Sequence, residues 1–212
     1  MRNISKGHEP VSLVQHRCQS DATYNNLPAI TKDELRRQLL KEQGYLCCYC
    51  MSRISEQDSR IEHWHSRASH QDKQLDYGNL LAACCGNRGN PPEDQYCDVR
   101  KGDQDILYNP AHADHDVQSK IKYLGNGIIK STDVMFDKQL DEVLNLNFSR
   151  LRANRSAVMQ GVKDALAQRG GQATGGQLRK DIQRWKASNS DGELKEYCQV
   201  AIYFLNKRLQ RA

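Results

Sequence analysis

The segments LCCYC (residues 46–50), AACC (residues 82–85) and CDVRKG (residues 97–102) hold six of the eight cysteines in this 212-residue chain. Cys47 and Cys50 have the C-x-x-C spacing of a zinc half-site, in which a tight turn puts two thiolates on one side of one ion. Clustered cysteines in a protein of the reducing cytosol indicate metal binding rather than disulfides. The sequence therefore predicts that bound zinc shapes the fold of this region.

A tetrahedral zinc site needs two further ligands, and we expect them to be Cys84 and Cys97. Cys85 competes with Cys84, and Cys48 points away from the turn in the simplest arrangement. A redox C-x-x-C or a set of inert thiols is an alternative, but no βαβ pattern surrounds the motif. The polar segment between the two cysteine groups is too short to fold on apolar burial alone, so zinc ligation would supply its folding free energy.

The segment RIEHWH (residues 60–65) has the alternation of a short strand and places a carboxylate beside an imidazole, at Glu62 and His63. Phosphodiester hydrolysis needs a base that deprotonates water and a cation that neutralises charge on the phosphate. His63 titrates in the range of such a base, and Glu62 offers a hard oxygen to a divalent cation. Because strand alternation would separate the two side chains, we expect a bend or bulge to bring them together.

Asp98, Lys101 and Asn79 complete the candidate site. Asp98 could supply a second carboxylate for the same cation, or it could cap the N-terminus of a helix. Lys101 could contact phosphate. Asn79 could hydrogen-bond across the hairpin and fix the loop that carries His63.

Other side chains nearby have simpler interpretations. We expect His65 and His70 to be surface or packing residues, although either is an alternative base. His112 and His115 lie in a polar loop where solvent exposure is the default. Trp64 is expected in the core rather than as a platform for a nucleic-acid base. None of the five is therefore assigned to the site.

Two patterns outside the cysteine region predict regular elements. Residues 31–34 have the form of a capping box, which would open a helix that Gly44 ends about three turns later. The sequence GNG at residues 125–127, between two apolar stretches, is a strong β-hairpin signal. The chain is therefore expected to mix helices with short strands.

The last third of the chain is predicted to be helical. Apolar residues recur at helical spacing over residues 137–166, and a final helix is expected from about Asp191. The glycine-rich stretch at residues 170–176 is expected to be a linker or an exposed loop. We place a soft domain boundary ahead of these helices, with a core domain at residues 1–135 and a basic helical lobe at residues 136–212.

Positive charge is concentrated in the last part of the chain. Residues 1–149 carry 18 Lys or Arg against 21 Asp or Glu, whereas residues 150–212 carry 13 against 5. A basic lobe is compatible with a polyanion such as nucleic acid, although a well-solvated helical face explains the charge equally well.

Composition is typical of a soluble globular protein, with 38% hydrophobic and 27% charged residues. No apolar run approaches membrane-spanning length, and the N-terminus lacks the apolar core of a signal peptide. We therefore expect a cytoplasmic protein without a membrane partner. In it, Cys18 and Cys198 would be small buried apolar side chains.

These motifs together resemble the HNH (ββα-metal) endonucleases. They are more closely similar to the HNH subunit of Septu anti-phage systems and of their retron-associated versions (PtuB-like proteins), over roughly residues 1–165. The motifs that carry the resemblance occur in the order Cys47-x-x-Cys50, Ile61-Glu-His63, Asn79-Leu-Leu, Cys84 and Cys97-Asp-x-x-Lys-Gly.

The resemblance implies a role for each site residue. His63 would be the general base, Asn79 would orient the loop, and Glu62 and Asp98 would bind the catalytic Mg²⁺ or Mn²⁺. The four cysteines would bind structural zinc. The chain departs from the broad HNH pattern at two positions, because Glu62 stands where Asp is more usual and Asp98 where His or Asn is. Both residues still offer oxygen ligands.

The resemblance also implies a fold and partners. The fold would be α+β and mostly helical, with a zinc-stabilised HNH core, an N-terminal helix and a helical C-terminal lobe. The substrate would be DNA or RNA. The partners would be an ABC/SMC-like ATPase subunit of the same defence system and, where a retron is present, its reverse transcriptase and DNA. The alternative is a zinc-dependent nucleic-acid-binding or ATPase-docking module without catalysis, which would have no need of a base beside two carboxylates.

Overall fold

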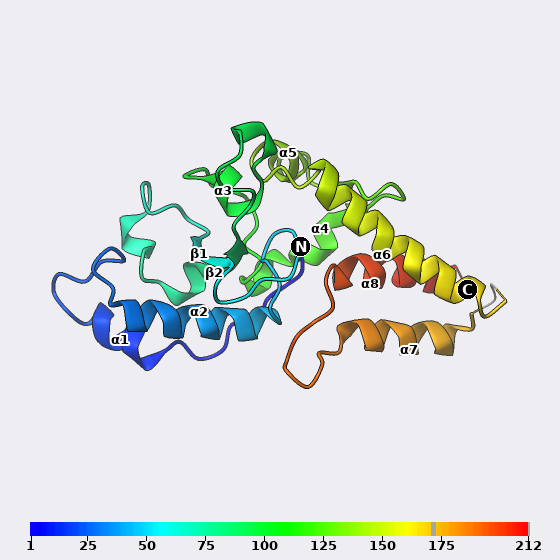
Figure 1. Cartoon of the computed structure of the whole chain (residues 1–212), viewed down its shortest axis with the longest axis horizontal. Coiled ribbons are helices and arrows are strands. Elements are labelled where there is room, and N and C mark those ends of the chain that lie inside the picture. Colours follow the sequence, from blue (N-terminus) through cyan, green and yellow to red (C-terminus); the bar gives the residue numbers. More distant parts are fainter. Residues whose placement is uncertain (171–172, 212) are drawn as a thin grey trace.

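The computed structural model describes residues 1–170 and 173–211. It is an α+β structure in which helices predominate and the named strands form two small sheets of two strands each (Figure 1). The predicted fold class is therefore confirmed as α+β with more helix than strand.

Helix α2 (Ala29–Gln43) leads into the cysteine region. The predicted capping box is wrong, because the helix begins after Pro28, whose fixed φ suits a helix start, and Thr31 lies buried inside the helix. Gly44 ends the helix as predicted, in the left-handed conformation at φ 61°. A Cβ at this position would lie 2.5 Å from the side chain of Leu194, so glycine is required here.

Strands β1 (Ser59–His63) and β2 (Leu80–Cys84) form an antiparallel pair, and helix α3 (Cys97–Lys101) contacts β2. The predicted strand is thus confirmed, but it ends at His63, two residues earlier than expected. The first four residues of β2 are buried, and the strand also contacts α2. The connection between the strands contains two 3-10 turns, η1 (Gln71–Lys73) and η2 (Tyr77–Asn79).

The predicted hairpin is confirmed as β3 (Ile121–Tyr123) and β4 (Ile129–Ser131), which pair antiparallel. Leu124 N donates to Ile128 O at 2.8 Å and continues the pairing into the turn. The remaining short elements are α1 (Val11–Arg17), η3 (Pro92–Asp94), η4 (Ala113–His115) and α4 (Val117–Lys120).

The helical pattern predicted from residue 137 is two helices, α5 (Val134–Glu142) and α6 (Ser149–Ala167). Between them Leu144 and Leu146 are fully buried, and Asn145 adopts a left-handed backbone at φ 47°. Leu144 O also accepts a hydrogen bond from the backbone of α3 at 2.9 Å. One continuous helix would place these two leucines on opposite faces, and the break between α5 and α6 allows both to be buried.

Two further helices follow, α7 (Gly175–Lys186) and α8 (Cys198–Leu209). The sequence reasoning missed α7, although Thr174 and Gln177 form a capping box at its start. It also placed the start of the last helix seven residues too early, because Tyr197 is left-handed at φ 52°. Of the predicted glycine-rich linker, residues 171–172 lie outside the described residues, and the prediction is wrong at Gly175 and Gly176, which begin α7.

The two isolated cysteines differ in exposure. Cys198 begins α8 and is buried, as predicted. Cys18 is exposed, so the expectation that it is buried is wrong. It follows directly after α1, where the short helix ends at the surface.

The segment just before α8 is hydrogen-bonded to the cysteine turn. Tyr197 N donates to Met51 O at 3.1 Å, and the Tyr197 hydroxyl lies 2.6 Å from the Ser52 hydroxyl. Arg53 N donates to the Glu196 carboxylate at 2.7 Å. Residues far apart in the sequence thus shape the same turn.

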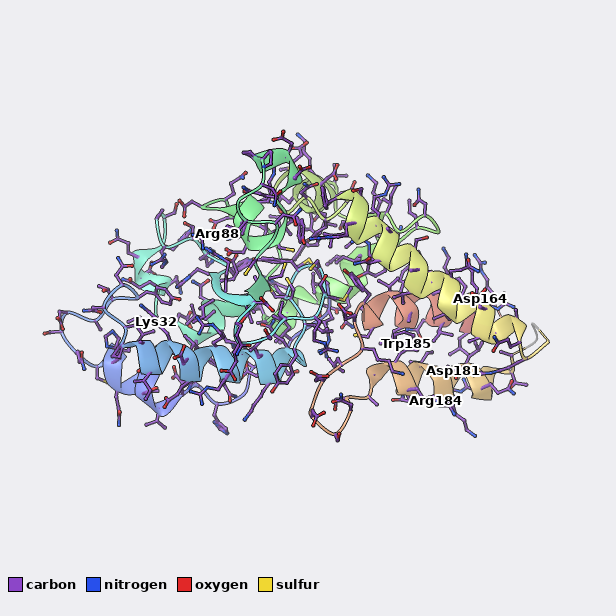
Figure 2. All side chains as sticks on the ribbon, viewed as in Figure 1. Lys32, Arg88, Asp164, Asp181, Arg184 and Trp185 are labelled. Atoms are coloured by element: carbon purple, nitrogen blue, oxygen red, sulfur yellow. The ribbon has the colours of Figure 1, made fainter. Side chains whose placement is uncertain are left out.

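The C-terminal helices α6, α7 and α8 lie together at one side of the molecule, with α8 in contact with both of the others (Figure 1). On α7, Asp181 accepts hydrogen bonds from Arg169 and Arg184; Figure 2 labels Asp181 and Arg184. Within residues 1–170 and 173–211, no helix is long and apolar enough to cross a membrane. The division into residues 1–135 and 136–212 stays a prediction.

Candidate active site

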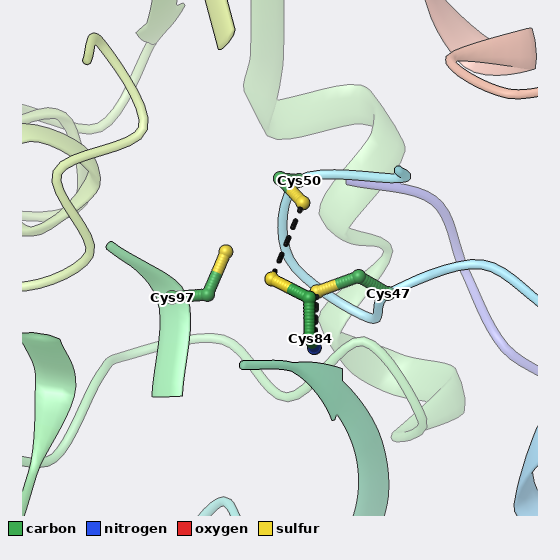
Figure 3. A group of neighbouring side chains, drawn as sticks. All are labelled: Cys47, Cys50, Cys84 and Cys97. Atoms are coloured by element: carbon green, nitrogen blue, oxygen red, sulfur yellow. Dashed lines mark hydrogen bonds between the residues drawn. The ribbon is translucent and has the colours of Figure 1, made fainter. Parts of the chain in front are cut away.

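Four cysteine side chains, one pair from the turn after α2 and one each from β2 and α3, meet in the interior (Figure 3). Their sulfur atoms all lie within 4.8 Å of one another, and Cys50 Sγ is 3.8 Å from Cys84 Sγ. Four sulfurs at about 2.3 Å from one zinc ion lie about 3.8 Å apart. Cys47, Cys50, Cys84 and Cys97 therefore form a buried group that could hold zinc.

Local backbone geometry brings these cysteines together. In the turn, Cys47 N donates to Ser52 O at 2.9 Å and Met51 N donates to Cys47 O at 3.1 Å. Cys97 adopts a left-handed backbone at φ 56°, and its N–H donates to Leu144 O at 2.9 Å. The turn and the start of α3 are thus held in shape by backbone hydrogen bonds.

The other two cysteines of the region lie apart from the cluster. Cys85 is exposed, and its thiol donates to Asp58 O at 3.4 Å. Cys48 is buried, and burial together with the neighbouring Cys47 raises the pKa of its thiol well above the ordinary value. Burial opposes ionisation of Cys47 as well, but thiol hydrogen bonds from its neighbours, including Cys50 and Cys84, hold its pKa well below the ordinary value. The cluster is therefore built to keep a thiolate.

Glu62 on β1 and Asp98 on α3 lie close to each other and line the same cavity. Glu62 Oε1 accepts a hydrogen bond from the Tyr49 hydroxyl at 2.7 Å and lies 3.0 Å from Lys101 Nζ. Asp98 Oδ2 accepts a hydrogen bond from Arg60 Nε. Burial, followed by the proximity of Asp98, raises the pKa of Glu62 well above its ordinary value. Two apposed carboxylates, each with one oxygen engaged by a protein cation, are a suitable donor set for a divalent cation.

His63 is the last residue of β1 and is only 7% exposed. Its Nε2 lies 3.0 Å from Gln74 O, and the Tyr24 ring packs edge-on against it with centroids 4.5 Å apart. Burial, together with the charges of Arg67 and Lys101, lowers its pKa to about 4. The imidazole is therefore neutral near pH 7. Because Nε2 faces a carbonyl, it carries the proton, and Nδ1 has the free lone pair.

One cavity of about 280 Å³ is lined by Glu62, His63 and Asp98. All five residues of β1 pair in regular register with β2, rather than through the bulge that the sequence predicted. The two adjacent residues both line the cavity although the pairing is regular up to His63, the last residue of the strand. The structure thus brings the predicted base and both predicted carboxylates to one place.

Asn79 lies at the end of η2 and bonds across the hairpin, as predicted. Its Oδ1 accepts from His65 N at 2.7 Å, and its Nδ2 donates to His65 O at 3.1 Å and to Lys73 O at 3.0 Å. It does not line the cavity with His63. Its geometry is therefore that of a residue that positions the loop after β1.

Comparison with known proteins finds similarity over part of the chain. No protein-family model matches the chain. The chain is 29% identical over 118 residues to an Escherichia coli protein named "Retron Ec83 putative HNH endonuclease", and the match covers 48% of this chain and 46% of that protein. The chain thus spans about half the length of this relative.

The structure adds cavity residues that the sequence reasoning passed over. Arg60, Arg67 and Arg88 line the cavity with the carboxylates; Arg88 is labelled in Figure 2. Arg60 stands two residues before Glu62, so the period of a strand could have placed both on one face. Lys101, expected at a phosphate, is instead 1% exposed and donates to His63 O at 3.0 Å. It is a positioning residue.

Proposed function

We propose that this chain is an HNH-type, metal-dependent endonuclease that hydrolyses phosphodiester bonds in nucleic acid. The observation that carries the proposal is the convergence of Glu62, His63 and Asp98 on one cavity beside a buried four-cysteine cluster. These residues occur on β1 and α3 of a strand–strand–helix unit, the order expected of a ββα-metal core. The similarity to a retron HNH endonuclease supports the same assignment.

Glu62 and Asp98 would hold the catalytic Mg²⁺ or Mn²⁺. Lys101 and Tyr49 both contact Oε1 of Glu62, and Arg60 contacts Oδ2 of Asp98, so one oxygen of each carboxylate is left for a cation. Hard oxygen donors suit these ions. When bound, the cation would neutralise the charge that develops on the phosphate and the leaving oxygen.

His63 would act as the general base. The Gln74 carbonyl fixes the proton on Nε2, so Nδ1 can take a proton from the attacking water. Asn79 would hold the loop after β1 through the backbone of His65. The nearby arginines would bind the phosphate backbone, which is how proteins position nucleic acid without reading its sequence.

Zinc at Cys47, Cys50, Cys84 and Cys97 would be structural. Cys97 and Asp98 are adjacent at the start of α3, so a zinc ion bound at Cys97 would also fix the position of the Asp98 carboxylate. Loss of zinc is therefore expected to disable the cavity along with the fold.

The biological setting is part of the proposal. Resemblance to the Septu subunit supports an anti-phage role with an ABC/SMC-like ATPase, and the name of the relative supports a retron partner with its reverse transcriptase and DNA. We infer a cytoplasmic location for the same reason. The helical lobe at residues 136–212 would be the docking element for the ATPase or a further surface for nucleic acid.

The test uses the zinc-loaded chain, alone and with the ATPase encoded beside it. Each is incubated with plasmid DNA and with total cellular RNA in the presence of Mg²⁺ or Mn²⁺. Cleavage should require the cation and disappear on chelation. His63→Ala should reduce the rate by about 10²–10⁴-fold, the usual contribution of a general base. His112→Ala, an exposed histidine outside the cavity, is the matched control and should cleave normally.

Two results would contradict the proposal. Cleavage by folded His63→Ala at the wild-type rate would exclude His63 as the base. No cleavage of either nucleic acid by the chain with its ATPase, in either metal, would favour a zinc-dependent binding or docking module without catalysis.

A further inference from the structure

A second cluster of metal-ligating side chains lies outside the cysteine group and the carboxylate pair. It consists of His65 and His70, from the loop after β1, and Asp105, from the segment after α3. One ligand atom from each lies within 4.8 Å of the others. His70 Nε2 is 3.0 Å from Asp105 Oδ2, and the two imidazole rings are 4.3 Å apart between centroids. Residues from two separate segments thus converge at one point.

His65 has an unpartnered nitrogen at this point. Its Nδ1 is buried and has no hydrogen-bond partner among the described residues. The nearest carboxylate oxygen, Asp105 Oδ1, is 3.8 Å away, which is too far for a hydrogen bond. A buried polar atom without a partner costs free energy, and an ion between His65 and Asp105 would satisfy it.

Hydrogen bonds of the loop after β1 hold the ligand residues in place. Both backbone groups of His65 are bonded to the Asn79 side chain, at 2.7 and 3.1 Å. His70 N donates to Ser66 O at 2.8 Å, and the Ser66 hydroxyl donates to Asp103 Oδ1 at 2.7 Å. The loop after β1 is therefore fastened both to η2 and to the segment that carries Asp105.

The three side chains are partly exposed. Those of His65, His70 and Asp105 are 31%, 34% and 47% exposed. Ligands of one zinc ion lie roughly 3–4 Å apart, so closure onto an ion needs side-chain shifts of about 1 Å.

We propose that His65, His70 and Asp105 bind a divalent transition-metal ion of the zinc type. Two imidazoles and one carboxylate select such ions over Mg²⁺, which prefers oxygen ligands alone. Three protein ligands leave at least one coordination position open for water or a phosphate oxygen. The site differs in ligand chemistry from the Glu62–Asp98 pair, and the proposal does not depend on nuclease activity.

Bound metal would also stiffen one wall of the cavity described above. Ser66 and Asp103 line that cavity, and both belong to the two segments that the ion would join. The ion would close the loop after β1 onto the segment after α3, beside the hydrogen bond that already links them.

The experiment measures Zn²⁺ binding by the full chain whose cysteine cluster is already loaded. Weakly held ions are first removed by dialysis against a mild chelator, and Zn²⁺ is then titrated calorimetrically in millimolar Mg²⁺. We expect one further Zn²⁺ per chain. His70→Ala and Asp105→Asn should each weaken it by at least about 10-fold, the lower range for loss of a metal-site partner. His8→Ala, which removes an exposed histidine of the N-terminal segment, should bind as the wild type does.

Two controls make the result decisive. Zinc retained in the cysteine cluster and the circular dichroism spectrum should match the wild type in every variant, which shows that the fold is intact. The double variant Glu62→Gln/Asp98→Asn should keep the additional Zn²⁺. Unchanged titration of His70→Ala and Asp105→Asn would overturn the proposal, as would loss of the additional ion in the double variant alone.

Discussion

Replacement of Cys97 by serine tests the zinc cluster most directly. Cys97 is fully buried, so no water molecule can take the place of the missing thiolate. A structural zinc site contributes about 10–16 kcal/mol, whereas a whole domain is stable by only about 5–15 kcal/mol. Loss of even a third of the zinc contribution, about 3–5 kcal/mol, approaches the lower end of that stability. We expect Cys97→Ser to be zinc-free and largely insoluble.

The assay compares Cys97→Ser with Cys85→Ser. Cys85 is exposed and its thiol contacts Asp58 O, outside the cluster, so its variant is a matched loss of one thiol. Zinc retained after dialysis against a mild chelator, soluble yield and thermal unfolding are measured for both. Cys85→Ser should keep the wild-type zinc content and unfolding midpoint.

The reasoning fails on either of two results. A soluble Cys97→Ser protein with its full tightly bound zinc and an unchanged midpoint would mean that Cys97 is not a ligand. Zinc loss in Cys85→Ser but not in a Cys84→Ser protein would mean that Cys85, and not Cys84, is the zinc ligand.

Three further predictions concern the cavity. Burial lowers the pKa of His63 to about 4, from about 6.5 in an unfolded chain, so the unfolded chain binds more protons between these values. The stability that neutral His63 contributes is present above about pH 6.5 and is lost as the pH falls toward 4. In His63→Gln, the free energy of unfolding measured in urea should therefore change with pH by about 3 kcal/mol less over this window than in the wild type. A pH dependence equal to that of the wild type would contradict this. Lys101→Met leaves Glu62 without its ammonium 3.0 Å away and should lower the free energy of unfolding by about 3–5 kcal/mol, against less than about 1 kcal/mol for Lys130→Met at an exposed ion pair. Asn79→Ala removes the two hydrogen bonds to the His65 backbone and should lower the free energy of unfolding by about 1–3 kcal/mol in the same assay. A stability equal to that of the wild type would refute a role for Asn79 in holding the loop after β1.

The candidate site was more predictable from the sequence than the helices were. Glu62 and His63 are adjacent in a strand pattern, and Asp98 follows a predicted zinc ligand, so local spacing carried most of the information. Cys84 and Cys85 could not be separated in this way. Their difference depends on where β2 ends and on which side the chain then turns, and both follow from packing against α2 and α3.

Long-range contacts account for most of what the sequence did not reveal. The cluster at His65 and Asp105 joins segments 40 positions apart and has no spacing motif. Leu144 fits the helical spacing of the residues before it, but Leu146, two positions later, is equally buried, and a continuous helix would place the two on opposite faces. By contrast, the start of α7 could have been predicted from the sequence, because Thr174 and Gln177 have the form of a capping box.

The contact between Tyr197 and Ser52 has a consequence for synthesis of the protein. It joins residues 145 positions apart, and Tyr197 N also bonds the backbone of Met51 in the same cysteine turn. Domains generally fold as their residues emerge from the ribosome, N-terminal parts first. Here the cysteine turn gains its contacts with Tyr197 only after residue 197 has been translated. A product truncated before Tyr197 would therefore lack the contacts that this residue makes with the turn.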